Sequence, residues 1–225
     1  MQERPLEPRS AEETQVVAAL LGLLLVVGVY AFLQSPYFAV AEVDVQGASA
    51  VAAEEIVALT GVHAGDNLLA LDLDAIAAGV EGHPRIQRAE VRRALPGVLR
   101  VTVTEYEPLL LVVVNGEATA LARDGTPIPV TPQEAERLPL VRGEADAAVL
   151  RLASLLPEDV HARVAEIVRE GGSLTLRTRS GETILLGDGT QLERKLDIAL
   201  DLLRQNRFAV IDVRFPSSPV VRVAP

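Results

Sequence analysis

The chain has 225 residues and a net charge of −10, and it contains no cysteine. This length allows one or two ordinary domains beside a membrane segment, and the missing cysteines exclude disulfides and thiol chemistry. The acidic balance argues against a general nucleic-acid surface, which needs a basic patch, and an aromatic content of 3% leaves little material for a cofactor pocket or a stacking platform.

Residues 16–33 form the most apolar stretch of the sequence, with 18 residues that include no charge and no Pro. As a helix they would be about 27 Å long, close to the thickness of the hydrocarbon core of a bilayer. The stretch is apolar all round, whereas a surface helix of a soluble domain would have a polar face. We therefore predict a transmembrane helix from Val16 to Leu33. A cleaved secretory signal is the alternative, because Ala39-Val40-Ala41 offers a small-x-small cleavage site.

The orientation of this helix follows from the basic residues at its two ends. Arg4 and Arg9 precede the helix, and the next basic residue after it is Arg85. Because basic residues near a membrane helix favour the cytoplasmic side, we expect residues 1–15 to form a cytoplasmic tail. Residues 34–225 should then lie outside the inner membrane.

The segment after the helix has the pattern of a small α+β domain, which we expect to cover residues 38–107. An extended run ends at Gly47, and two helical segments follow, the second of which starts after Asp72. We interpret Asp72 and Asp74 as a helix cap with a favourable charge at the helix start. The predicted order is strand, helix, helix, strand, strand, with both helices on one face of the sheet. The expected ranges are 40–47, 50–60, 73–80, 86–95 and 99–103.

Residues 108–225 are richer in strands, and we expect them to form a second, mixed β-rich domain with two or three helices. The run Leu109–Val114 is fully apolar, which is typical of a buried strand. Turn signals at Asn115-Gly116 and Asp124-Gly125 follow it, together with an irregular stretch at 126–132. Further on we predict helices at 145–156 and 191–206 and strands at 164–168, 173–178, 182–186 and 210–215, before a terminal segment of Val220 to Val223.

The sequence carries no motif that predicts catalysis. We find no nucleophile elbow, phosphate-binding loop or zinc-protease motif, and the residues at 187–189 have the spacing of a turn before a helix. His63, His83 and His161 lack a second His at metal-ligand spacing, and we interpret them as ordinary surface residues. We therefore predict no catalytic residue, no cofactor and no metal site.

Two sets of short segments resemble a known family. The first resembles a POTRA domain of the FtsQ/DivIB kind and consists of residues 65–72 (GDNLLALD), 84–86 (PRI), 89–91 (AEV), 93–96 (RALP) and 101–105 (VTVTE), with Pro108 just after. The second is similar to β-domain segments of the same bacterial division proteins and consists of residues 121–125 (LARDG) and 211–215 (IDVRF). The order of tail, span, POTRA domain and β domain also resembles this family, although the tail is very short and aromatic residues near the C-terminus are few.

The resemblance implies a non-enzymatic, single-pass scaffold of the bacterial division machinery, located in the inner membrane at the division septum. Such a scaffold links early cytoplasmic division components to septal peptidoglycan synthesis. The implied partners are FtsB-like and FtsL-like division proteins, with the septal peptidoglycan synthases as further candidates. Nucleic acid, a small-molecule substrate and a cofactor are not implied.

In this family a strand near the C-terminus binds the partner. The resemblance implies the same role for the terminal segment of the present chain. An open strand edge has unpaired backbone groups that an extended partner segment can bind. An alternative interpretation is that Phe215 and Val221 are core residues that close the sheet. The implied partner-binding residues are Arg214, Phe215, Val220, Val221, Arg222 and Val223.

Two other functions remain open. A membrane-anchored extracytoplasmic enzyme acting on the cell wall would need convergent acids, or a Ser with a base, in a concave site. A POTRA-type assembly factor for outer-membrane proteins would need a C-terminal β-barrel of many alternating strands, for which we expect no room in the 225 residues.

Overall fold

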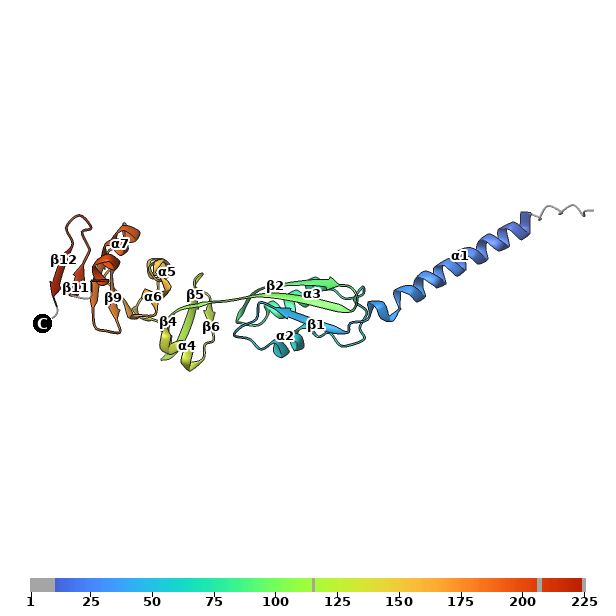
Figure 1. The fold of residues 1–225 in the computed structure, drawn as a ribbon, viewed down its shortest axis with the longest axis horizontal. Helices are drawn as coiled ribbons and strands as arrows, with labels where there is room; N and C mark the ends of the chain where they lie inside the picture. The colour runs from blue at the N-terminus through green and yellow to red at the C-terminus, as the bar shows by residue number, and fades with distance from the viewer. Residues whose placement is uncertain (1–10, 115, 206–207, 224–225) are drawn as a thin grey trace, which may run out of the picture. The chain divides into compact units, whose positions relative to one another are not determined.

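The structure is a computed structural model that describes residues 11–114, 116–205 and 208–223. It divides into two compact units, residues 1–105 and residues 106–225 (Figure 1). Arg4 and Arg9 of the expected cytoplasmic tail, Asn115 of the expected turn and Asn206 at the end of an expected helix lie outside the described residues.

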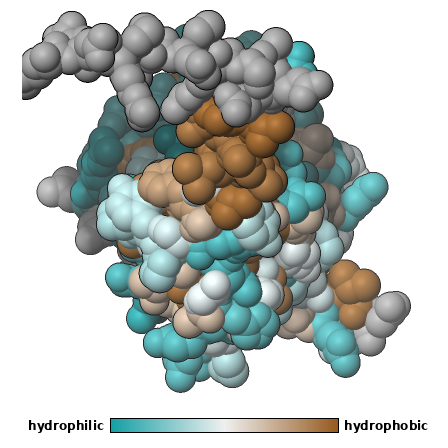
Figure 2. Space-filling model, turned by 90° about the vertical axis from the view of Figure 1, so that its right-hand side faces the viewer, coloured by the Kyte–Doolittle hydropathy of each residue, from teal (hydrophilic) through white to brown (hydrophobic). Residues whose placement is uncertain are grey.

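Helix α1 (Ala11–Leu33) contains the whole apolar run. Its residues 15–33 are long and apolar enough to cross a membrane, and their side chains are exposed all round. Figure 2, which looks onto the molecule from the side of α1, shows an apolar brown mass against a paler and teal surface. The helix begins five residues before the predicted Val16, in sequence whose Ala and Glu residues favour helix, and it ends at Leu33 as predicted. It is compatible with a single-pass membrane anchor.

The first unit has the predicted order of strand, helix, helix, strand, strand. After the 3₁₀ turn η1 (Pro36–Phe38), its elements are β1 (Glu42–Gln46), α2 (Ala53–Thr60), α3 (Leu73–Glu81), β2 (Ile86–Ala94) and β3 (Val98–Glu105). The sheet has the order β1-β3-β2, with β1 parallel and β2 antiparallel to the central strand. Leu99 and Val101 of β3 are fully buried against Ile56 of α2 and Val80 of α3, while Arg100 and the alternate residues after it are exposed. One face of the sheet therefore packs against the helices and the other faces solvent.

A carboxylate from β3 binds the backbone that leads into α2. The Glu105 carboxylate accepts hydrogen bonds from the N–H groups of Ser49 (3.0 Å), Ala50 (2.9 Å) and Val51 (3.0 Å), and from the Ser49 hydroxyl (2.7 Å). The cap residue of α2, Ala52, makes no side-chain cap bond, and Glu105 binds the three N–H groups just before it. Residues 49–51 are thus bound outside the helix, and α2 starts three residues later than the predicted position 50.

The other helix ends of this unit lie where the sequence predicts them. Helix α2 ends at Thr60, and Gly61 follows with φ of +64°, a left-handed conformation that glycine adopts without steric strain. The Asp72 carboxylate accepts a hydrogen bond from the Ala75 N–H at 3.1 Å, which confirms the interpretation of Asp72 as a helix cap.

The bonds to residues 49–51 also control the acidity of Glu105. Partial burial acts to raise the pKa of Glu105, but the donors of Val51, Ala50 and Ser49 lower it by more, from an ordinary 4.5 to about 2. Because this folded-state pKa lies below the unfolded-state value, the charged carboxylate stabilises the fold above pH 4.5. The contribution is lost as the pH falls from 4.5 toward 2.

In the described residues, the second unit is built on one nine-stranded sheet with the order β12-β11-β10-β9-β8-β7-β4-β5-β6. Its strands are β4 (Pro108–Val114), β5 (Glu117–Ala122), β6 (Pro127–Ile128), β7 (Leu140–Gly143), β8 (Val164–Glu170), β9 (Ser173–Thr178), β10 (Thr183–Gly187), β11 (Phe208–Asp212) and β12 (Val220–Val223). Its helices are α4 (Pro132–Arg137), α5 (Ala147–Leu155), α6 (Glu158–His161) and α7 (Leu192–Leu203). Strands β8, β9 and β10 form the predicted antiparallel meander, whereas β10 and β11 are parallel and connected through α7.

Two apolar clusters stabilise this unit. The larger one packs α5 and α7 on strands from β7 to β11, with Leu152, Ile167 and Leu176 fully buried. The smaller one lies around β4, β5 and β6 and consists of Leu111, Ala120, Ala122, Ile128 and Leu138.

Strand β4 and the stretch from β6 to β7 differ from the sequence predictions, and α7 ends at Leu203 rather than at the predicted position 206. Strand β4 is buried only in its first half, because Val113 and Val114 are 58% and 51% exposed. Strand β6 lies in the stretch expected to be irregular, and α4 and β7 follow where we predict no element. Helix α4 has a complete capping box between Thr131 and Glu134, and the sequence T-P-Q-E carried this signal.

We expect Glu105→Gln to lower the free energy of unfolding by about 1 to 3 kcal/mol, because the amide places an N–H₂ group against backbone donors that need acceptors. Urea unfolding at a series of pH values measures this loss, which should be largest above pH 4.5 and shrink toward pH 2. Glu42→Gln is the control, because Glu42 is an exposed acid at the start of β1. A loss that does not change with pH would contradict the role of the Glu105 charge.

Candidate partner-binding edge

Strand β12 is at one edge of the nine-stranded sheet. It pairs with β11 in antiparallel register, with Val221 opposite Ile211 and Val220 opposite Asp212. In the part of the chain that the structure describes, no strand lies on its other side, so the backbone groups that point away from β11 form a free edge. All four side chains of β12 are exposed, with Val220 at 64% and Val223 at 65%.

Arg214 and Phe215 lie in the connection between β11 and β12. The predicted last strand, 210–215, is wrong at its C-terminal end, because β11 ends at Asp212. The Asp212 carboxylate accepts the Arg214 N–H at 3.1 Å, and the Phe215 carbonyl accepts a backbone N–H three residues later at 3.0 Å, so the chain turns here. Phe215 is 72% exposed and Val221 is 38% exposed, and therefore neither is a buried core residue.

An ion pair holds the Arg214 side chain against the end of β11. Its guanidinium donates to the Asp212 carboxylate through Nε at 3.0 Å and Nη2 at 2.6 Å. This bond lowers the pKa of Asp212 and raises the pKa of Arg214. The same side chain lies over Gly187, where an added Cβ would be 3.1 Å from the Arg214 Cγ and where φ is +74°. Gly187 therefore permits both the left-handed backbone and the close approach of Arg214.

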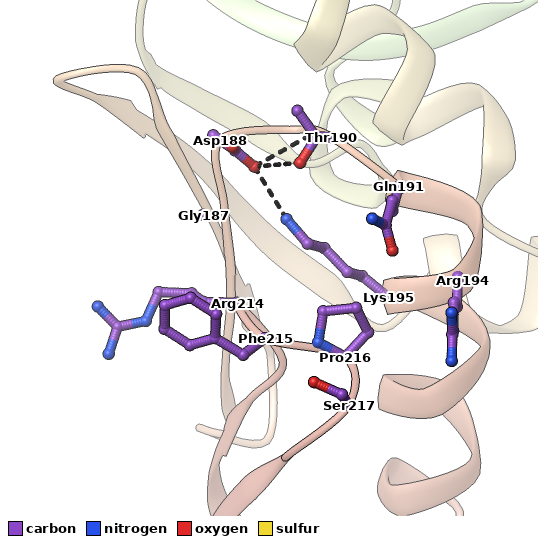
Figure 3. Close-up of a pocket in the computed structure, with 10 residues that line it drawn as sticks. All are labelled: Gly187, Asp188, Thr190, Gln191, Arg194, Lys195, Arg214, Phe215, Pro216 and Ser217. Carbon is purple, nitrogen blue, oxygen red and sulfur yellow. Dashed lines mark hydrogen bonds and ion pairs between the residues drawn. The ribbon is translucent and has the colours of Figure 1, made fainter.

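A pocket of about 600 Å³ lies beside residues 214–217. The end of β10, the first turn of α7 and residues 214–217 line it (Figure 3). The Lys195 side chain, only 3% exposed, extends from α7 toward Asp188, and its Nζ lies 2.9 Å from the Asp188 Oδ1 (Figure 3). The same carboxylate oxygen accepts hydrogen bonds from the Thr190 N–H at 3.1 Å and the Thr190 hydroxyl at 2.8 Å.

These contacts determine the charge state of Asp188. The hydrogen bond from Lys195 is the largest cause, and with the two bonds from Thr190 it lowers the pKa of Asp188 to about 2. A carboxylate this acidic is ionised at neutral pH and poorly matched to proton transfer there. The pair therefore joins the first turn of α7 to the end of β10.

The Lys195–Asp188 pair is absent from our sequence predictions, although the sequence carried a signal for it. Lys195 is the only lysine of the chain, and it lies three residues after Leu192 and four before Ala199, on the apolar face of α7. A cation on a buried helix face needs an anionic partner, and Asp188 is in the turn before the helix. Strand β10 ends at Gly187 and α7 begins at Leu192, which confirms the predicted turn at 187–189.

None of the three histidines lines the pocket. His63 is the exposed surface residue that we expect, but His83 is only 17% exposed and lies 3.4 Å from a Glu55 carboxylate oxygen. The His161 Nε2 is 2.7 Å from the Leu109 carbonyl oxygen, so this ring joins α6 to β4. Among residues 11–114, 116–205 and 208–223, no group of three or more His, Asp or Glu side chains is close enough together to hold a metal ion.

We expect Gly187→Ala to destabilise the second unit by about 1 to 2 kcal/mol, because an L-residue is strained in the left-handed conformation. The new methyl group would also press on the Arg214 side chain. Gly172→Ala is the matched control, because its φ of +81° is similar but nothing lies within 4 Å of an added Cβ. Urea denaturation should show a larger loss of the free energy of unfolding for Gly187→Ala than for Gly172→Ala. Equal losses would mean that contact with the Arg214 side chain does not add to the backbone strain at position 187.

Two family models match the chain. The model described as "POTRA domain, FtsQ-type" matches residues 38–106. The model described as "Cell division protein FtsQ/DivIB, C-terminal" matches residues 111–214. The second match ends at Arg214, so β12 lies beyond it.

Relatives named cell division protein FtsQ are similar to most of the chain. The protein of Myxococcus fulvus is 33% identical over 176 residues, which are 70% of this chain and 61% of the relative. The protein of an Anaeromyxobacter species is 34% identical over 181 residues, 72% of this chain and 61% of the relative. The protein of Streptomyces venezuelae is 29% identical over 226 residues, 92% of this chain and 83% of the relative. The matched region thus spans 61% of the length of the first two relatives.

The solved structures that match include the major extracytoplasmic domain of the trans isomer of the cell division protein DivIB from Geobacillus stearothermophilus. The match covers 45% of this chain and 97% of that chain, at 18% identity and a TM-score of 0.33. The two family models and the FtsQ relatives agree along both units, and the chain belongs to the FtsQ/DivIB family of bacterial cell division proteins.

Proposed function

We propose that this chain is a non-enzymatic, single-pass scaffold of the division machinery, located in the inner membrane at the division septum. It binds an FtsB-like protein, itself paired with an FtsL-like protein, and links cytoplasmic division components to septal peptidoglycan synthesis. The septal peptidoglycan synthases are further partners in this proposal. The observation that carries it is the free edge of β12 in a chain of the FtsQ/DivIB family.

The edge of β12 has the properties of a site for strand addition. Proteins commonly protect sheet edges with charged residues, Pro, bulges or very short strands. Strand β12 is short and carries one charge, Arg222, but its other three positions are Val, and Val220 and Val223 are largely exposed. An extended partner segment can bond to the outward backbone groups and cover these valines at the same time.

Arg214 and Phe215 supply the side-chain contacts in this proposal. Aromatic residues and Arg are enriched at the positions that dominate binding energy in protein interfaces. Phe215 is exposed, and the ion pair with Asp212 holds Arg214 in one place, so little side-chain freedom remains to be lost on binding. Both residues lie in the connection that leads directly into β12.

An enzyme acting on the cell wall is the second candidate, and the pocket beside residues 214–217 is the feature that would favour it. The carboxylate of this pocket is Asp188, which is bound to Lys195 and has a pKa of about 2. This pairing suits a structural contact better than acid–base catalysis at neutral pH. We therefore assign no catalytic residue to the pocket.

The orientation in this proposal follows from Arg4 and Arg9 before α1, which favour a cytoplasmic N-terminus. A reporter enzyme that is active only outside the cytoplasm, fused after residue 225, should therefore be active in cells. The same reporter fused before residue 1 should be inactive. The reverse pattern would contradict the orientation.

We expect a proline in β12 to separate binding from stability. The Val213 N–H donates to the Leu185 carbonyl of β10, so by alternation Ile211 also faces β10. Val221 is opposite Ile211 and therefore donates outward, whereas the next residue, Arg222, donates to β11. Proline at the outward position removes one donor that a partner needs and leaves the bonds to β11 intact. We expect Val221→Pro to weaken partner binding more than it lowers the melting temperature, and Arg222→Pro to lower both.

Pull-down with the detergent-solubilised full chain measures this binding, with FtsB-like and FtsL-like proteins identified by mass spectrometry. A chain ending at Phe215 should recover neither protein, provided that its melting temperature shows a folded second unit. If Val221→Pro and Arg222→Pro lower partner binding equally and also lower the melting temperature equally, β12 has only a structural role. Recovery of both proteins by the shortened chain would support the scaffold function, but it would mean that the partners bind at a site other than β12.

A further inference from the structure

The first unit carries exposed apolar side chains at the end from which α1 departs. In residues 34–105, all of which the structure describes, the exposed large apolar side chains are Tyr37 (52%), Leu59 (36%), Leu69 (44%) and Leu95 (50%). Tyr37, Leu69 and Leu95, which we call the apolar rim, come from three separate segments. The hydrogen bonds of these segments place them around one point of the fold, the linker of residues 34–41 that follows α1.

The loop that carries Leu69 is bonded to the end of α1 and to the linker. The Asn67 Nδ2 donates to the Leu33 carbonyl, the last of the helix, at 2.7 Å. The Leu68 N–H donates to the Phe38 carbonyl at 2.8 Å. Leu69 is therefore two residues from a direct contact with the apolar helix.

The turn that carries Leu95 lies against the same linker. The Gly97 carbonyl accepts the Ala41 N–H at 2.7 Å. A Cβ on Gly97 would be 3.2 Å from the Ala39 carbonyl oxygen, so the two backbones are in close contact. The β2–β3 turn is thus at the α1 end of the unit (Figure 1).

Arg93 joins the two sides of the rim. Its Nε donates to the Leu68 carbonyl at 2.5 Å, and its Nη2 donates to the Leu71 carbonyl at 2.7 Å. The end of β2 and the loop of Leu69 are therefore held together: Arg93 is two residues before Leu95, and the two carbonyls that it binds flank Leu69.

Residues 34–40 separate α1 from Ala41, the farther of the two linker residues to which these segments are bonded, and three of them form the compact turn η1. We propose that Tyr37, Leu69 and Leu95 dock on the outer surface of the lipid bilayer that holds α1, so that the first unit rests on the membrane. The inference rests on the membrane anchoring of the proposed function. Tyr is suited to the headgroup region because one end of its ring is polar, and Leu side chains gain apolar contact at the acyl boundary.

The test uses the full chain in vesicles of neutral and anionic phospholipid, with lipid as the only available occupant of the rim. The chain has no native cysteine, so single reporters can be placed by Leu69→Cys and Leu95→Cys. Thr104→Cys is the control, an exposed position near the other end of β3, about 20 Å from the start of that strand. Each cysteine carries a polarity-sensitive fluorophore, and spin-labelled lipids quench it.

We expect the reporters at positions 69 and 95 to emit at shorter wavelength and to be quenched by lipids labelled near the headgroup, whereas the reporter at 104 should show neither effect. Leu69→Asp in the Leu95→Cys chain should weaken the quenching at 95 without a change in melting temperature. The same emission wavelength and the same lipid quenching at positions 69, 95 and 104 would overturn the proposal. The apolar rim would then contact a protein partner or solvent.

A reporter at Leu24→Cys, in the middle of α1, separates this proposal from the anchoring on which it rests. Quenching of that reporter by lipids labelled deep in the acyl chains is expected if α1 spans the bilayer. Absence of that quenching would overturn the membrane anchor of the proposed function. Deep quenching at 24 without shallow quenching at 69 and 95 would overturn only the docking of the rim.

Discussion

The requirement that every backbone N–H and C=O group finds a partner governs the second unit. An open sheet meets this requirement everywhere except along its two edges, and here the edges differ. At one edge β6 is only two residues long and begins at Pro127, so it offers few donors. At the other edge β12 offers four residues, of which three are Val. In the described residues, the sheet therefore has its longer unpaired edge at the C-terminal strand.

Carboxylates hold the junctions between elements in both units. Glu105 binds the turn before α2, Asp146 caps α5 and also binds Arg169, and Asp188 joins the α7 helix to β10. Each of these acids has a lowered pKa, because donors converge on its charged form. Acidic residues are abundant in a chain of net charge −10, and these three bind groups of the fold itself.

Periodicity along the sequence predicts the repeating elements well and their junctions poorly. The alternation in β3 and the i, i+3, i+4 pattern in α7 depend on burial of one face, which a local pattern records. The start of α2 depends instead on Glu105, which is 54 residues from Val51 along the chain. At the candidate site, the resemblance to the FtsQ/DivIB family implied an edge strand at Val220 to Val223, where the structure has β12. The end of β11 depends on a bond between Asp212 and the Arg214 backbone, which alternation along the strand does not record. The Lys195–Asp188 pair could have been predicted from a lone cation on the apolar face of a helix with an acid in the preceding turn, although not its distance of 2.9 Å.

The burial of the single lysine makes the chain unusual as a target of lysine-directed reagents. A lysine-specific protease finds its one cleavage position in α7, where the Lys195 side chain is 3% exposed and its amine is bound to Asp188. A protease must draw several residues around the cut into its active site, so the helix has to open before the bond can be broken. The rate of this single cleavage therefore reports how often the second unit opens around α7, in a chain that needs no engineered reporter.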